Sequence, residues 1–268
     1  MIPKKIHYIW IDKSEDYIYK LPKIYQMCMM SARLYNPDYE IILHTNKQID
    51  WDLLRPEDFK LEFIESNLTD EAIRFGLPYD TKQYFYLSHM SDWLRWNYLK
   101  EDGGIYLDTD IVITSPFDDL LDEHFVVAKE EGDAICAGVI LSEQGHPIID
   151  RILDTYRNDY HPDEWVYNAQ QKPYEYMKED DSVTIIEQKE GYHYPYIWDY
   201  ILYYAPCEKI ENDEDIRKYF KTRGHHLFGH MNKPHLRAFE AADGNTYIGQ
   251  LGKYILRRYG VDDKKEGE

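Results

Sequence analysis

The chain has 268 residues, of which 43% are hydrophobic and 30% charged, and its formal net charge at pH 7 is −19. This composition indicates a globular protein large enough for one big domain or two small ones, and the negative charge argues against a nucleic-acid partner, whose phosphates would be repelled. Three scattered cysteines, and no apolar run approaching about 18 residues, predict a cytoplasmic protein without disulfides or membrane spans.

The N-terminus reads as a strand over residues 5–11. Apolar side chains lie on both of its faces, which predicts a central strand of a parallel sheet. No apolar core of a signal peptide precedes this strand, which agrees with the cytoplasmic expectation. Trp10 closes the strand, and the simplest interpretation of this side chain is a core tryptophan.

Apolar residues at helical spacing predict a helix over residues 21–35 that ends near Asn36-Pro37. Two further strands are expected over residues 39–44 and 60–64, and this alternation predicts a βαβ-type sheet. The sequence has neither a Gly-x-Gly-x-x-Gly motif nor a Walker loop. A bound nucleotide would therefore be held by a stacking ring, acidic groups and a metal.

Residues 91–113, SDWLRWNYLKEDGGIYLDTDIVI, are the most informative stretch. They begin as a helix that is apolar nearly all round, as expected of a buried helix. Asp92 and Arg95 lie three residues apart on neighbouring positions of this helix. Buried charges need a partner or a ligand, because desolvating them alone costs several kcal/mol. An ordinary ion pair and a ligand-binding pair are both compatible with the pattern.

The double glycine at 103–104 ends this helix, and a strand over 105–107 leads into Asp-Thr-Asp at 108–110. In an extended chain the side chains of Tyr106, Asp108 and Asp110 would share one side. Two carboxylates on one side repel each other unless a cation lies between them. The pattern therefore predicts a metal site, although Asp-x-Asp alone is common in surface turns.

The run SDWLRWNYLKEDGGIYLDTD resembles glycosyltransferase family 32, the DXD-containing sugar transferases, and is similar to the catalytic domain of the bacterial glucosylating toxins. The opening IPKKIHYIW resembles the first strand of the same families. The resemblance implies a single GT-A-type α/β domain over residues 1–268, with a Rossmann-like mixed sheet and helices on both faces. Its nucleotide-sugar part would span about 1–115 and its acceptor and site-closing part about 116–268.

Further elements are expected in the second half of the chain. Strands are predicted over 124–129, 134–141 and 183–186, and helices follow His146-Pro147 and span 247–259. Residues 136–138 are the expected wall beside the sugar and acceptor. The pattern weakens over 159–181, where the Thr-Gly-Pro of the resembling family is absent, so the acceptor side of the site is not predicted.

Four histidines lie within eleven residues, at His225, His226, His230 and His235. A zinc site, a site for a metal and a diphosphate, and surface histidines are the competing interpretations, and the spacing matches no familiar zinc pattern. The resembling family carries His-His-Trp-x-x-Ser-Trp here, and His230 and Met231 replace its serine and tryptophan. The resemblance implies that His226, or else His225, contacts the metal or the phosphate.

The resemblance gives each site residue an expected role. Asp110 would bind Mn²⁺ or Mg²⁺ directly, because hard cations prefer carboxylate and phosphate oxygens. The expected catalytic residues are Asp108, Asp110 and Arg95. The expected substrate contacts are Trp10 stacking on the donor base, Asp92, Arg95, Tyr106, Asp108 and His226, and the expected metal ligands are Asp110, Asp108 and His226.

The predicted function is metal-dependent transfer of a hexose from a nucleotide diphosphate sugar, with uridine as the expected base. The acceptor would be a hydroxyl of a glycan or lipid-linked saccharide, as in surface polysaccharide synthesis. The resemblance implies retention of anomeric configuration, and the absence of an evident nucleophilic side chain favours front-face attack. A metal-dependent phosphate or sugar ester hydrolase is one alternative. A non-catalytic glycan-binding module, with 26 tyrosines as stacking surfaces, is the other.

The C-terminal helix is locally basic in this acidic protein, through Lys253, Arg257, Arg258, Lys264 and Lys265. Basic residues at a helix C-terminus complement the helix dipole. The alternative interpretation is peripheral contact with an anionic lipid carrier at the inner membrane face.

Overall fold

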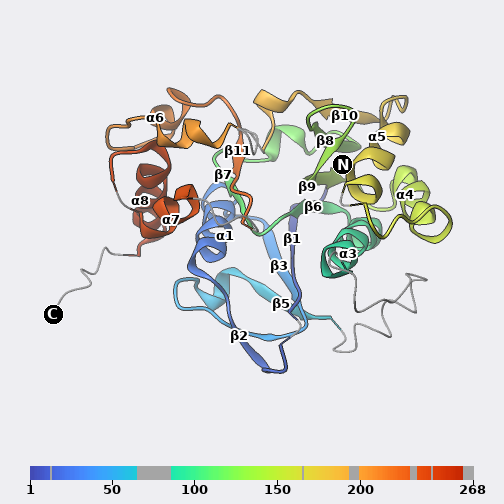
Figure 1. Cartoon of the computed structure of the whole chain (residues 1–268), viewed down its shortest axis with the longest axis horizontal. Coiled ribbons are helices and arrows are strands. Elements are labelled where there is room, and N and C mark those ends of the chain that lie inside the picture. Colours follow the sequence, from blue (N-terminus) through green and yellow to red (C-terminus); the bar gives the residue numbers. More distant parts are fainter. Residues whose placement is uncertain are drawn as a thin grey trace.

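The computed structural model describes residues 1–12, 14–64, 86–164, 166–192, 199–229, 234–242 and 244–261. Its main sheet consists of β1 (Lys5–Trp10), β3 (Glu40–Thr45), β5 (Lys60–Phe63), β6 (Gly104–Leu107), β8 (Phe125–Lys129), β9 (Ile135–Ser142) and β10 (Val183–Ile186). The order across this seven-stranded sheet is β10-β8-β9-β6-β1-β3-β5 (Figure 1). Small sheets pair β2 (Ile18–Lys20) with β4 (Gln48–Asp50), and β7 (Ile111–Ile113) with β11 (Gly224–His226).

The sheet is mixed, as expected. Four neighbouring strands of the sheet run parallel to one another, in the order β6, β1, β3 and β5. Strand β9 runs antiparallel to both β6 and β8. The described helices are α1 (Lys23–Tyr35), α3 (Tyr86–Asp102), α4 (Pro147–Asn158), α5 (Lys172–Met177), α6 (Asp213–Arg217), α7 (Pro234–Ala241) and α8 (Tyr247–Tyr259). The strands and helices predicted from periodicity are therefore confirmed, with their ends shifted by a few residues at most.

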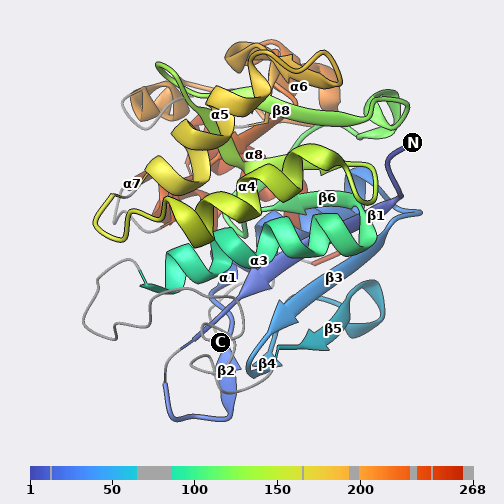
Figure 2. The ribbon, with the colours of Figure 1, turned by 90° about the vertical axis from the view of Figure 1, so that its right-hand side faces the viewer.

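Helices cover both faces of the sheet. Figure 2 shows α3, α4 and α5 lying over one face, and α1, α7 and α8 lie on the other side. Side chains of β1 divide between two apolar cores, because successive residues of a strand point to opposite faces. Ile6 and Tyr8 pack in the core that includes α1 and α8, and Ile9 packs in the core that includes α3 and α4.

Helix α3 is buried along most of its length, as its all-round apolar sequence predicts. Trp93, Trp96 and Leu99 are each at most 2% exposed. The double glycine that follows is required by its backbone: Gly103 and Gly104 have φ of 66° and 98°, and a Cβ on Gly104 would lie 2.5 Å from the Lys5 carbonyl oxygen. Glycine therefore lets the helix end directly against β1.

The sequence also predicts that the chain has no membrane spans and that its three cysteines form no disulfides. Among the residues that the structure describes, no helix combines the length and apolar composition needed to span a membrane. The three cysteines are buried and free, as expected.

Two histidines are buried between β1, β3 and α3. His7 and His44 are at most 2% exposed, and His7 Nδ1 lies 2.9 Å from His44 Nε2. The Tyr98 ring stacks on His44 with centroids 3.7 Å apart. Burial lowers the pKa of His7, and burial together with the neighbouring His7 lowers the pKa of His44 to about 3.

This pair predicts that the protein loses stability as the pH falls from about 6.5 towards 5. The unfolded chain takes up protons near its ordinary histidine pKa, whereas burial opposes protonation of the folded pair, so the unfolded state binds more protons in this window. Each such histidine contributes a slope of at most about 1.4 kcal/mol per pH unit to the free energy of unfolding. Urea unfolding at several pH values measures this slope, and His44→Gln should reduce it. An unchanged slope in His44→Gln would contradict this origin.

Candidate functional site

A cavity of about 640 Å³ opens beside the carboxyl ends of β1 and β6. Ligands in open α/β sheets bind at this edge, in crevices outside the ends of the strands. Every residue expected at the site lines this cavity, namely Trp10, Asp92, Arg95, Tyr106, Asp108, Asp110 and His226. The fold therefore brings together residues from β1, α3, β6, the 108–110 turn and β11.

The chain at 108–110 differs from the extended conformation that was expected. It forms a turn in which the Ile111 amide donates to the Asp108 carbonyl oxygen at 3.1 Å. Aspartate favours such turns because its short side chain competes with the backbone for hydrogen bonds. The turn leads into β7, which pairs antiparallel with β11 in a register that sets Ile111 opposite His226.

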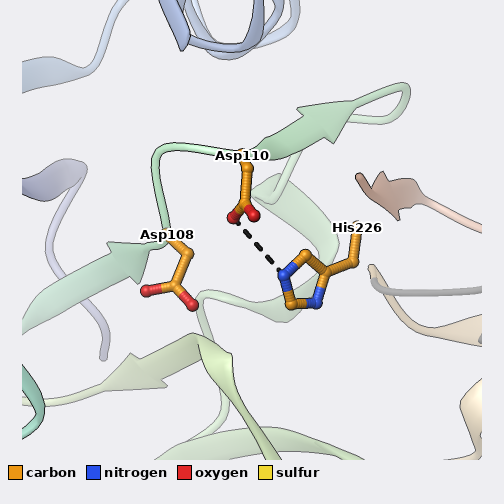
Figure 3. A group of neighbouring side chains, drawn as sticks. All are labelled: Asp108, Asp110 and His226. Carbon is orange, nitrogen blue, oxygen red and sulfur yellow. Dashed lines mark ion pairs between the residues drawn. The ribbon is translucent and has the colours of Figure 1, made fainter. Parts of the chain in front are cut away.

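This pairing completes a potential metal site. One carboxylate oxygen each of Asp108 and Asp110 and one ring nitrogen of His226 all lie within 4.8 Å of one another (Figure 3). Two carboxylates and an imidazole are suitable ligands for a divalent cation such as Mn²⁺ or Mg²⁺. A cation here would also remove the repulsion between two close carboxylates. The donor set thus fits the metal that the sequence predicts.

Asp110 is held from several sides. Its Oδ1 lies 3.4 Å from His226 Nε2, and its Oδ2 accepts a hydrogen bond of 2.6 Å from the Gly229 amide. Its carbonyl oxygen accepts a second bond from the Leu227 amide at 2.9 Å. Burial opposes the charge on His226, but Asp110 and Cys136 outweigh it and raise the pKa of His226.

Asp108 is held by a different set of groups. Its Oδ1 accepts a 2.7 Å hydrogen bond from the Tyr106 hydroxyl and lies 3.4 Å from Arg95 Nη2. Its amide donates to the Gly138 carbonyl oxygen at 2.8 Å, and a Cβ at position 138 would lie only 2.8 Å from Asp108 Oδ2. Residues 136–138, the expected wall of the site, line the same cavity.

Asp92 and Arg95 form the expected buried pair on α3. Arg95 Nη2 lies 2.7 Å from Asp92 Oδ1, and both residues are buried, with Arg95 5% exposed and Asp92 9% exposed. Arg95 also donates to the Ala137 carbonyl oxygen at 2.6 Å, and its guanidinium lies 4.4 Å from the Tyr106 ring centroid. Burial, which outweighs the adjacent guanidinium, raises the pKa of Asp92 to about 6.

Trp10 lies at the edge of the core and not within it. The side chain is partly buried and lines the cavity, with its ring centroid 5.4 Å from Tyr19 and 4.9 Å from Tyr25. Its indole Nε1 has no hydrogen-bond partner among the described residues. This placement is compatible with a ring that stacks on a ligand.

Trp10→Ala distinguishes the two interpretations of this residue. If the indole stacks on the donor base, UDP binding should weaken by about 1–3 kcal/mol. If it acts as a core residue, the protein should lose about 3–5 kcal/mol of folding stability with its UDP affinity unchanged. Calorimetric UDP binding and denaturant unfolding measure the two effects. Trp51→Ala is a matched control, because Trp51 packs on Phe59 outside the cavity.

The histidines separate into distinct environments. His225 is fully buried, and its Nε2 lies 2.6 Å from the Tyr247 hydroxyl, away from the residues that line the cavity. His235 is also buried, with Nε2 2.8 Å from the Leu227 carbonyl oxygen. His230 lies outside the described residues. Among the described histidines, His226 alone lines the cavity.

Other cavity residues were not anticipated from the sequence. Tyr25 reaches the cavity from α1, and Glu130 reaches it from the turn after β8, where burial raises the pKa of its carboxyl. A π-helical turn over Tyr167–Gln171 contributes Ala169, Gln170 and Gln171 from the segment whose pattern was weak. No local signal in the sequence distinguishes these residues, since only the packing of distant segments brings them here.

Comparison with known proteins gives three kinds of match. Residues 22–126 match the family described as glycosyltransferase sugar-binding region containing DXD motif. Glucan organizing enzyme 1 of Cryptococcus neoformans is 24% identical over 96% of this chain and 67% of its own length. Subversion of eukaryotic traffic protein A of Legionella pneumophila is 29% identical over 59% of this chain, but the match covers 26% of that protein.

Among solved structures, the galactosyltransferase LgtC in complex with donor and acceptor sugar analogs is 15% identical, with a TM-score of 0.50. The match covers 96% of this chain and 95% of that one. At this identity the likeness shows the fold, which is the GT-A fold predicted above. The predicted resemblance to the DXD-containing sugar transferases is confirmed by the family match.

Proposed function

We propose that this chain is a glycosyltransferase that transfers a hexose from a UDP-sugar, and the DXD-containing sugar-binding region at residues 22–126 and the GT-A fold support this proposal. The acceptor is a hydroxyl of a glycan or lipid-linked saccharide, the anomeric configuration is retained, and the product enters surface polysaccharide. The observation that carries the proposal is the convergence of Asp108, Asp110 and His226 in the cavity that Trp10 also lines.

Each residue has a role in this proposal. Asp110 and His226, with Asp108, would hold Mn²⁺ or Mg²⁺, and such a cation would supply positive charge next to the leaving diphosphate. Trp10 stacks on the base. Asp108 and Asp92 accept hydrogen bonds from sugar or ribose hydroxyls.

Arg95 adds positive charge beside the diphosphate. Its guanidinium also fixes Asp108 and Asp92, through the 3.4 Å and 2.7 Å ion pairs. The Tyr106 hydroxyl fixes the other side of the Asp108 carboxylate. These contacts place the carboxylates before the substrate binds, so little reorganisation is needed at the moment of reaction.

The two alternative functions have less support. A hydrolase with two metals needs a second group of ligands, and within the described residues the 108, 110 and 226 group is the one that qualifies. A non-catalytic glycan-binding module would have no use for the paired carboxylates of Asp108 and Asp110 beside the buried Asp92–Arg95 pair.

A thermal-shift panel tests the donor. UDP-glucose and UDP-galactose should raise the melting temperature in the presence of Mn²⁺, and GDP-mannose or Mn²⁺ alone should raise it less. Equal stabilisation with and without Mn²⁺, or a preference for GDP-mannose, would contradict the proposal. Proton NMR of the product with a simple sugar acceptor then determines whether the anomeric configuration is retained.

Peripheral membrane contact remains a separate proposal. Arg257 donates to the Ile210 carbonyl oxygen, and Arg258 lies 3.3 Å from Asp213, so both arginines have contacts within the protein. Lys264 and Lys265 lie outside the described residues. Sedimentation with phosphatidylglycerol vesicles tests the contact, and Lys253→Glu should weaken it if α8 faces the lipid.

A further inference from the structure

We infer that Tyr25 is a positioning residue that couples the nucleotide-stacking ring of Trp10 to the metal ligand Asp110. The inference rests on the proposed function, because it assumes that the cavity holds both a nucleotide and a divalent cation. It assigns to the first turn of α1 a role that its sequence did not indicate. Binding of the base should then change the affinity of the metal site without any contact between the two ligands.

Tyr25 touches both halves of the site. On one side its ring lies 4.9 Å from the Trp10 ring, with the planes at 50°. On the other side it packs directly on Gly229, where an added Cβ would lie 2.8 Å from Tyr25 Cε1 and 2.9 Å from its hydroxyl oxygen. A displacement of Trp10 therefore reaches Gly229 through one rigid aromatic ring.

Gly229 in turn controls the position of Asp110. Its amide donates the 2.6 Å hydrogen bond to Asp110 Oδ2, and the same added Cβ would lie 3.3 Å from the Asp110 Cβ. The Leu227 amide holds the Asp110 carbonyl oxygen from the same segment. Groups that hydrogen-bond a ligating carboxylate orient it, and their loss commonly weakens metal binding.

The segment between His226 and Gly229 has a strained backbone, and this segment is the element that would shift when the two ligands are coupled. Phe228 has a φ of 54°, an uncommon value for a residue with a side chain. Its ring stacks on the proposed metal ligand His226 with centroids 4.0 Å apart. Strain of this kind persists only where surrounding contacts maintain it, so a shift of Tyr25 can be passed on to both His226 and Asp110.

The coupling is tested with uridine, which carries the base and ribose but no phosphate that could touch the metal. Mn²⁺ affinity is measured by electron paramagnetic resonance of free Mn²⁺, with and without saturating uridine. In the unaltered protein, uridine should tighten Mn²⁺ binding by roughly fivefold or more, and Mn²⁺ should tighten uridine binding by the same factor. In Tyr25→Ala both factors should fall to one.

Tyr19→Ala is the matched control. Tyr19 packs on Trp10 from another side, with centroids 5.4 Å apart, but does not line the cavity. This variant should keep the coupling factor even if uridine binds more weakly. Uridine and Mn²⁺ that bind independently in the unaltered protein, or coupling that survives Tyr25→Ala, would overturn the role of Tyr25 and leave the proposed function intact. Failure of uridine to bind at all would overturn both.

A second variant covers the case in which Tyr25→Ala does not fold. Gly229→Ala places a methyl group between Tyr25 and Asp110, and should weaken Mn²⁺ binding by about 10- to 100-fold. Combining it with Tyr25→Leu removes the aromatic edge that the methyl group meets, and should restore part of the affinity. Unchanged Mn²⁺ affinity in Gly229→Ala, or no recovery in the double variant, would also overturn the inference.

Discussion

Asp110→Asn is expected to remove Mn²⁺-dependent UDP binding and to lower the transfer rate by about 100-fold or more, or about 3 kcal/mol. The amide keeps an acceptor for the Gly229 amide, whose bond to Asp110 Oδ2 is 2.6 Å, but loses the negative charge that the cation needs. The melting temperature of the metal-free protein should change little, because removing one charge also relieves repulsion from Asp108.

Asp150→Asn is the control for this change. Asp150 is an exposed carboxylate on α4 that pairs with Lys100, and its loss should leave both UDP binding and transfer unchanged. Titration of UDP with and without Mn²⁺ separates nucleotide binding from metal binding. If Asp110→Asn keeps its Mn²⁺-dependent activity, the metal site has been assigned to the wrong residues.

Arg95→Ala is expected to destabilise the protein by about 3–5 kcal/mol, because it leaves Asp92 buried without its charge partner. The guanidinium also contacts Asp108 and the Ala137 carbonyl oxygen. Its loss therefore removes contacts both to the Asp-Thr-Asp turn and to residues 136–138, which line the cavity. Transfer should be lost even at temperatures where the variant is folded. Denaturant unfolding and assays well below the melting temperature measure the two effects separately.

The double variant Asp92→Leu, Arg95→Met separates structure from function. If the pair serves only the fold, two apolar side chains should recover much of the lost stability, and activity should return with it. The proposed role predicts recovered stability without activity, because the charge beside the diphosphate is still missing. A stable and fully active double variant would remove both residues from the donor site and leave the Asp-Thr-Asp turn as its main support.

Much of the fold follows from local sequence signals. The 3.6-residue periodicity of α1 and α8, the apolar strands and the double glycine after α3 each reflect a conformational preference within a few residues. The buried Asp92 and Arg95 were also foreseeable, since charges in an apolar helix must be paired. The π-helical turn at Tyr167–Gln171 was not, because its sequence lacks a periodic apolar pattern.

The sequence by itself determined the chemistry of the site. The tertiary structure decided which residues lie together in it. Asp108 and Asp110 lie two residues apart in the chain, so their pairing is local, even though a turn and not a strand presents them. His226 joins them only because β11 pairs with β7 more than a hundred residues earlier in the chain, and the same register buries His225 against Tyr247.

Tyr25 likewise looks like one apolar position of α1 until the fold sets it between Trp10 and Gly229. Local preferences act between neighbours in sequence, whereas these contacts depend on how strands and helices far apart in the chain pack together. Packing of that kind depends on the complementary shapes of whole helices and strands. No short motif in the sequence indicates it.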